Sequence, residues 1–374
     1  MRRLFFILLL FSGACKQSYL PPVSSASSTY LVVDGFINNS LDSTYISLTH
    51  TFKLDDTASV TPELHAQVTV EGRDNSSYPL SEWGNGQYGA TSLTLSTAQQ
   101  YRLHIRTTSG KEYVSDYLDL KTSPPIDSIS WARTNDGVQI YANTHDPQNA
   151  SHYYRWDYLE TWEFNSNYAA TLQFNNNEIE ILSPDPYYTC WKYAAPTTIL
   201  IGSSTTLASD VIALAPLVLI PSGSWKIGIR YSIQVKQYVL TADAFNFWGE
   251  MQKSSQNIGT IFSTQPSQPM SNVHNVADTT EEVIGFVSAG TMQKTRIFIT
   301  PDQIPNWIPE PDFTCTQMEV PEDSVAYEVE HQNQLLINGA NPHPGDPRQF
   351  YNMASKFCVD CRNTGTIIKP SFWP

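Results

Sequence analysis

The sequence is poor in charge, and above all in basic residues. Charged side chains make up 16% of the 374 residues, and 36 acidic residues against 22 basic ones give a formal net charge of −14 at pH 7. A surface of this sign repels phosphate backbones. We therefore expect no nucleic-acid partner.

The sequence also lacks the motifs of common catalytic and metal centres. It contains no HExxH or HxH pattern, no GxSxG nucleophile elbow and no Walker-type phosphate loop. Its eight histidines are scattered, and no two have the i, i+4 spacing that places both on one face of a helix. We therefore expect a protein that is not an enzyme and that holds no metal or other cofactor.

Long hydrophobic runs are missing as well. The run Leu4–Phe11 has eight apolar residues, whereas a membrane-spanning helix needs about 20. Two arginines precede it, and three small residues and Cys15 follow, an order typical of a secretory signal peptide over residues 1–14. The order is similar to a bacterial lipobox, whose cysteine becomes lipidated, although Ser12 stands where that motif usually has a branched apolar residue. The alternative is an ordinary signal peptide cleaved near Ala14.

The segment after the cysteine has little that could be buried. Residues 16–29 contain two prolines and five serines, a composition typical of a flexible tether. We expect residues 15–29 to consist of the lipidated Cys15 and this tether. The folded part would then be anchored to a membrane without spanning it.

Cysteine is scarce, but the number beyond Cys15 is even. The four are candidates for two disulfides with three possible connectivities, and we favour a local link near the C-terminus; they are Cys190, Cys315, Cys358 and Cys361. The last two have the CxxC spacing of zinc and redox sites. Zinc would need a second ligand pair with comparable spacing, and a redox pair would lie at the start of a helix in a βαβ unit. Structural disulfides are therefore the better interpretation.

What the sequence has in quantity is aromatic and β-branched residues with frequent turn signals, which favour strands. Alternating segments such as YLVVDGFI and QYRLHIRT predict strands with one buried face. Over residues 30–122 they predict an N-terminal β-sandwich of the Ig-like or transthyretin-like kind. The fold class expected for the whole chain is mostly β, with two tandem sandwiches.

The prolines at Pro124 and Pro125 mark the boundary to a second β-rich domain over residues 126–374. One inserted helix is predicted near residues 241–256, capped by Thr241 and packed over a sheet. A long tail from Pro301, rich in proline, asparagine and glycine, is expected to wrap this domain, held by its cysteines.

Three aromatic residues in a predicted strand, Trp156, Tyr158 and Trp162, are candidates for ligand binding, because aromatic faces stack on sugars and other planar groups. The alternative is an aromatic cluster in the core between two sheets. A separate pattern, Asp followed by Ser or Thr, resembles the O-glycosylation signal of exported Bacteroidota proteins. It predicts modification at Ser43, Thr57, Ser128, Thr279 and Ser324.

The order of motifs along the chain resembles a known family. LVVDGFI, HAQVTVEG and PPIDSISW are followed by RYSIQVKQYVLTADAFNFWGEM and CVDCRNTGTIIKPSFW. This is similar to the Bacteroidota lipoproteins catalogued as domain of unknown function 4249. The resemblance implies an outer-membrane lipoprotein encoded beside TonB-dependent receptors, and it brings no established ligand or catalytic residues.

From these observations we expect a lipid-anchored lipoprotein of the outer membrane, on the cell surface rather than the periplasmic face. Its expected role is that of a non-enzymatic accessory subunit of a TonB-dependent nutrient or metal uptake system, with the barrel as partner. The alternatives are a stand-alone surface glycan-binding lipoprotein and a structural component of the envelope.

Overall fold

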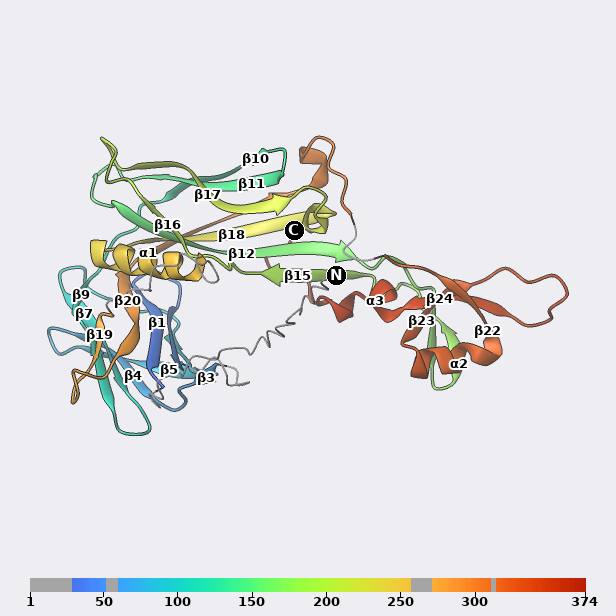
Figure 1. The fold of residues 1–374 in the computed structure, drawn as a ribbon, viewed down its shortest axis with the longest axis horizontal. Helices are drawn as coiled ribbons and strands as arrows, with labels where there is room; N and C mark the ends of the chain where they lie inside the picture. Colours follow the sequence, from blue (N-terminus) through green and yellow to red (C-terminus); the bar gives the residue numbers. More distant parts are fainter. Residues whose placement is uncertain (1–28, 52–59, 257–270, 311–313) are drawn as a thin grey trace, which may run out of the picture.

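The computed structural model describes residues 29–51, 60–256, 271–310 and 314–374. The protein is mostly β, as the composition predicts, and it is elongated, with three lobes (Figure 1). We call them the N-terminal lobe (residues 29–120 and 271–290), the central lobe (121–165, 189–256 and 291–310) and the C-terminal lobe (166–188 and 314–363). Residues 364–374 return to the central lobe. No helix in the described ranges is long and apolar enough to cross a membrane.

The N-terminal lobe is one curled sheet of eleven strands with the path β19-β8-β7-β4-β5-β6-β2-β1-β20, and β3 and β9 pair beside that path. Its strands are β1 (Leu31–Asn38), β2 (Thr44–His50), β3 (Thr61–Pro62), β4 (Gln67–Gly72), β5 (Ser77–Gly84), β6 (Gln87–Ala90), β7 (Gln100–Arg106), β8 (Glu112–Ser115), β9 (Leu118–Asp119), β19 (Val273–Asn275) and β20 (Val283–Gly290). The two ends of the path, β19 and β20, contact each other, so the sheet closes around one apolar core.

Alternation in the sequence explains these strands. In β7, Tyr101, Leu103 and Ile105 are buried, while the side chains between them face outward. The same period places Leu31 and Val33 of β1 in the core.

The strands β19 and β20 correct the expected division of the chain. The sequence places residues 126–374 together in a second domain, but β20 pairs in parallel with β1 over its whole length, and β19 pairs with β8. The close approach of β20 to β1 depends on Gly285, whose φ is +132° and where a Cβ would lie 1.8 Å from the carbonyl oxygen of Val33. The chain therefore returns to the N-terminal lobe after it has built most of the central one.

The central lobe has two packed layers (Figure 1). A three-stranded sheet, β10-β11-β17, lies over the sheet β15-β12-β18-β21, to which β16 adds by pairing with β12. The strands are β10 (Ile126–Arg133), β11 (Gly137–His145), β12 (Tyr153–Asn165), β15 (Thr189–Ala194), β16 (Leu200–Ser203), β17 (Val211–Pro221), β18 (Arg230–Val239) and β21 (Met292–Ile299). The apolar core lies between the layers and contains Ile140, Ile220 and Ile233.

The helix α1 (Ala242–Gln256) confirms the predicted helix, and the hydroxyl of Thr241 accepts a hydrogen bond from the N–H of Ala244 at 3.2 Å. The helix joins the two lobes. Phe247 packs against Phe286 of β20 at 5.5 Å between ring centroids, and Phe245 packs against Tyr153 of β12 at 4.9 Å.

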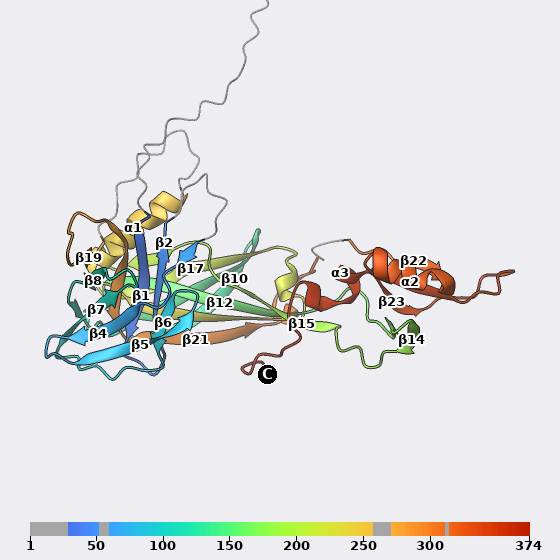
Figure 2. The ribbon, with the colours of Figure 1, turned by 90° about the horizontal axis from the view of Figure 1, so that it is seen from below.

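The C-terminal lobe projects from the other end of the central lobe, as both views show (Figures 1 and 2). It consists of the hairpin β13 (Leu172–Asn175) and β14 (Glu178–Ile181), the sheet β22-β24-β23 and two helices. The bounds are β22 (Met318–Pro321), α2 (Glu322–His331), β23 (Gln334–Gly339), β24 (Phe350–Ser355) and α3 (Lys356–Val359). The prediction that the tail from Pro301 wraps the second domain is therefore wrong for most of the tail, because residues 314–363 form a lobe with its own apolar clusters.

Candidate functional site

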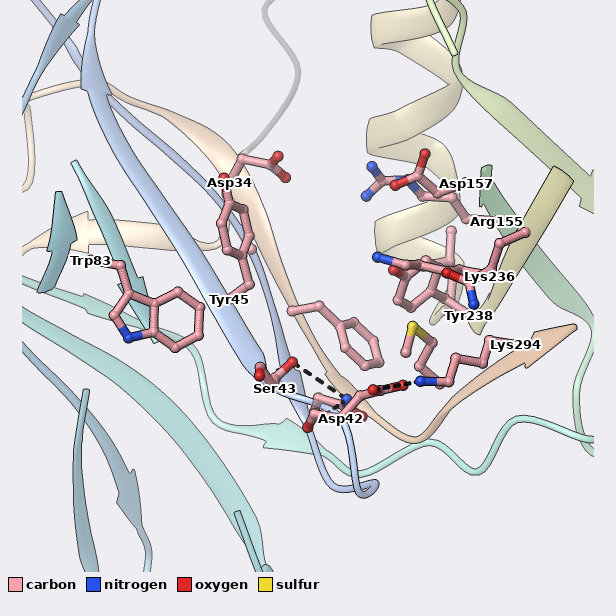
Figure 3. A pocket seen from close by; sticks show the side chains of 16 residues that line it. Asp34, Asp42, Ser43, Tyr45, Trp83, Arg155, Asp157, Lys236, Tyr238 and Lys294 are labelled. Carbon is pink, nitrogen blue, oxygen red and sulfur yellow. Dashed lines mark hydrogen bonds and ion pairs between the residues drawn. The ribbon is translucent and has the colours of Figure 1, made fainter. Parts of the chain in front are cut away.

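A cleft of about 470 Å³ separates the N-terminal lobe from the central lobe (Figure 3). One wall comes from β1, β2 and β5, and the other from β12, β18 and β21. The residues that line it include Asp34, Phe36, Asp42, Tyr45, Trp83, Arg155, Asp157, Lys236, Tyr238 and Lys294. Acidic, basic and aromatic side chains thus face one space.

The central-lobe wall consists of outward-facing residues on three neighbouring antiparallel strands. Their register places Asp157 opposite Lys236, and Lys236 opposite Lys294. Alternate residues of the same strands, such as Val235, fill the core. Because side chains alternate across a sheet, the charged row is held on the cleft side by the burial of its neighbours.

This wall carries three cations, Arg155, Lys236 and Lys294. Lys294 pairs with Asp42 at 2.7 Å across the cleft. Within the described ranges, neither Arg155 nor Lys236 forms an ion pair. The guanidinium carbon of Arg155 lies 3.8 Å from the ring centroid of Trp248 in α1, a cation–π contact that places the cation against the indole ring.

The N-terminal wall carries two exposed aromatic side chains. Trp83 is 49% exposed and Tyr45 is 44% exposed. The indole of Trp83 lies over Gly89, where a Cβ would be 2.7 Å from the ring atom Cζ2, so the glycine provides the space for this ring. Burial, and then the negative charge of Asp34, raises the pKa of Tyr45, so its phenol stays neutral at physiological pH.

The N-terminal and central lobes also contact each other directly at the cleft. The rings of Phe36 and Tyr238 contact edge to face at 4.8 Å between centroids. Burial, followed by the charge of Asp157, raises the pKa of Tyr238. Only Thr291 separates β20 from β21, and its N–H donates to the carbonyl oxygen of Lys121 at 2.8 Å. The lobes are therefore joined by hydrogen-bonded strand connections.

The aromatic residues that the sequence suggested for ligand binding lie elsewhere. Trp156, Tyr158 and Trp162 are 3%, 8% and 9% exposed and belong to the central-lobe core. The indole N–H of Trp156 donates to Gln237 at 3.0 Å inside that core. The ligand-binding interpretation of these three is corrected to the alternative, an aromatic cluster between the sheets, because the even-numbered positions of β12 face inward.

The four candidate disulfide cysteines form two bonds, Cys190–Cys361 and Cys315–Cys358. The CxxC cysteines are therefore bonded to different partners. No group of three or more His, Cys, Asp and Glu side chains in the described part of the chain could hold a metal ion.

Other predicted positions remain predictions. The signal peptide, Cys15, the tether up to residue 28 and Thr57 lie outside the described residues. Among the other proposed glycosylation sites, Ser43, Ser128 and Thr279 are exposed and Ser324 is half-buried.

The cleft residues could not be found from sequence motifs, since they come from strands far apart in the chain. One signal was present: in the alternating segment 229–240, Lys236 and Tyr238 share the face opposite the apolar one. A misleading signal was also present. Residues Gly84–Gly89 have the spacing GxGxxG, but they form the hairpin between β5 and β6, whereas dinucleotide binding requires a strand-to-helix turn.

Comparison with known proteins adds the family. No match was found among curated proteins. The model of a family described as a domain of unknown function (DUF4249) matches residues 16–296, which is well over half of the chain and includes every residue of the cleft. The protein belongs to the DUF4249 family.

Proposed function

We propose that the protein is a lipid-anchored lipoprotein of the outer membrane and a non-enzymatic accessory subunit of a TonB-dependent uptake system. The observation that carries this proposal is the cleft between the lobes. It is open to solvent and combines exposed aromatic rings with charged groups of both signs, and no histidine or cysteine is among the described residues that line it. Such a lining suits reversible binding of a small cargo.

The proposed anchor explains how weak binding would be sufficient. Lipidation at Cys15 and a tether over residues 16–29 would hold the folded lobes close to the membrane, on the cell surface. Confinement beside a barrel raises the effective concentration to about the millimolar range for short linkers. The cleft would receive the cargo, and another face would contact the transporter.

We also propose that the N-terminal and central lobes are two sandwiches of the Ig-like kind. The closed core of the first and the two packed layers of the second support this. In this proposal β19 and β20 complete the first sandwich although they follow α1 in the chain.

The test is a purification of the full-length lipoprotein from its native outer membrane in mild detergent. A TonB-dependent barrel recovered in stoichiometric amount supports the proposal. Recovery of an intact lipoprotein without any barrel, even after crosslinking, would contradict it. A Cys15→Ser variant, which cannot be lipidated, is expected in the soluble periplasmic fraction and serves as the matched control.

Glycan binding is the second candidate, because Trp83 and Tyr45 are exposed in the cleft. A Trp83→Ala variant should then lose binding to a neutral oligosaccharide such as maltotriose or cellotriose in calorimetric titrations. If the wild-type protein binds neither sugar, this candidate loses its support.

A further inference from the structure

We propose that the cleft binds a short zwitterionic peptide, with the peptide carboxylate on Arg155 and Lys236 and the amino terminus near Asp34. The inference rests on the proposed function in one respect, that the cleft is the cargo site. It adds the chemical class of the cargo.

The carboxylate end is assigned from Arg155 and Lys236, the two lining cations that form no ion pair within the described part of the chain. Arg155 lies on β12 and Lys236 on the neighbouring β18, and both line the cleft. The Trp248 ring contacts the guanidinium of Arg155, and a guanidinium offers the bidentate geometry that carboxylates prefer. Asp157 lies opposite Lys236, so the part of the wall outside the Lys294–Asp42 pair keeps a net positive charge.

The amino end is assigned from the opposite wall. Asp34 is exposed on β1 and has no ion pair within the described ranges. Tyr45 and Trp83 line the same side, and aromatic faces attract ammonium groups. Figure 3 shows Asp34 beside Tyr45, with Arg155 and Lys236 across the cleft.

The cleft has cations on the central-lobe wall and a carboxylate, Asp34, on the opposite wall. This separation of charges favours a peptide over a saccharide. A neutral sugar would satisfy neither wall, and an acidic sugar would leave Asp34 without a counterion. An amino acid chain carries both charges, one at each end. An extended di- or tripeptide spans about 7 to 11 Å, and a sphere with the 470 Å³ of the cleft is about 10 Å across.

The experiment is calorimetric titration of the full lipoprotein in detergent with the tripeptide Ala-Phe-Ala and with two blocked forms. N-acetylation removes the amino charge and C-terminal amidation removes the carboxylate. Because charge-assisted contacts are lost, each block is expected to weaken binding about tenfold or more. Equal binding of all three peptides, or no binding of any, would overturn the inference.

Variants of the two walls test which end of the peptide each wall binds. Lys236→Met should weaken binding of the free peptide about tenfold and leave the amidated peptide unchanged, while Lys236→Arg retains most of the affinity. Asp34→Asn should show the same pattern against the N-acetylated peptide. Lys253→Met on the exposed side of α1 is the matched control and should change neither titration. A Lys236→Met variant that weakens both peptides equally would overturn the assignment of the carboxylate.

The outcomes separate this inference from the proposed function. Recovery of a barrel without peptide binding contradicts the inference alone. Peptide binding without a barrel contradicts the accessory-subunit role alone. Binding of maltotriose or cellotriose in place of the peptide replaces the inference with glycan binding.

Discussion

The central and C-terminal lobes are stabilised in different ways. Among the described residues, the core between the layers of the central lobe has 21 buried members, 20 from the central lobe and Cys361 from the end of the C-terminal lobe, whereas the two apolar clusters of the C-terminal lobe contain 5 and 4. Small units bury too little apolar surface to be stable alone and commonly need covalent links. Cys315–Cys358 closes the C-terminal lobe, and Cys190–Cys361 connects its end to the central core. The two disulfides therefore supply covalent links to the lobe that has the small apolar clusters.

The largest effect is expected from the double variant Cys315→Ser with Cys358→Ser. Loss of this disulfide should destabilise the C-terminal lobe by about 2 to 5 kcal/mol, while β12 and β18 keep their protection. Limited proteolysis with mass spectrometry should find new cleavage sites between residues 314 and 363. Ser324→Ala in the same lobe is the control, and equal loss of protection in the central lobe would contradict the comparison.

Lys226→Met tests the central core. Glu160 is 2% exposed, and Lys226 Nζ lies 2.8 and 2.7 Å from its two carboxylate oxygens. Removing the cation leaves a buried carboxylate whose remaining side-chain donor among the described residues is Tyr231. Because Lys226 is 27% exposed, we expect a loss of about 2 to 3 kcal/mol, at or below the lower end for buried pairs.

The measurement for Lys226→Met is urea unfolding of the central lobe, followed by tryptophan fluorescence. Adding Glu160→Gln to the variant removes the uncompensated charge and should restore part of the loss. No restoration would show that packing of the lysine chain, and not charge, is responsible.

Thr241→Ala tests the helix between the N-terminal and central lobes. The variant loses the hydroxyl that caps α1 and should cost about 1 kcal/mol. Hydrogen exchange of the first turn of α1 is expected to rise. Thr241→Ser keeps the cap and should behave like the wild type.

The smallest effect concerns acid sensitivity of the N-terminal lobe. Burial alone would raise the pKa of Glu281, but hydrogen bonds from Tyr113 and Lys111 hold it below its usual value. A carboxyl whose pKa is lower in the folded than in the unfolded state stabilises the fold. This stability is fully present above the unfolded-state pKa and is lost as the pH falls through the folded-state pKa. Exchange protection of β19 should therefore decrease on acidification below about pH 4.5. Glu281→Gln should lose this pH dependence, and a wild-type profile in that variant would contradict the explanation.

The sequence predicted the strands well where burial is one-sided. Alternation places Leu103 and Ile105 in a core without knowledge of any partner strand. The pairing of the strands could not be predicted in this way, because β1 and β20 are some 250 residues apart and neither contains a signal for the other. The alternation in β12 defines two faces, and the sequence alone does not decide which of them is buried. In the structure the buried face is the aromatic one, with Trp156.

The candidate site was beyond prediction for the same reason. Arg155, Lys236 and Lys294 become neighbours only through the register of three strands. Likewise, four cysteines allow three pairings, and the fold selects the one that joins Cys361 to Cys190.

The parallel pairing of β1 with β20 has a mechanical consequence. The chain enters the N-terminal lobe at the first residue of β1 and leaves it for β21 at the last residue of β20. The part of a pull on the N-terminus that passes through the link from β20 to β21 acts on opposite ends of one eight-residue ladder, along the strand axes. Such a load shears all the hydrogen bonds together and does not open them one after another. The N-terminal end of β1 is thus attached to a ladder that is loaded in shear.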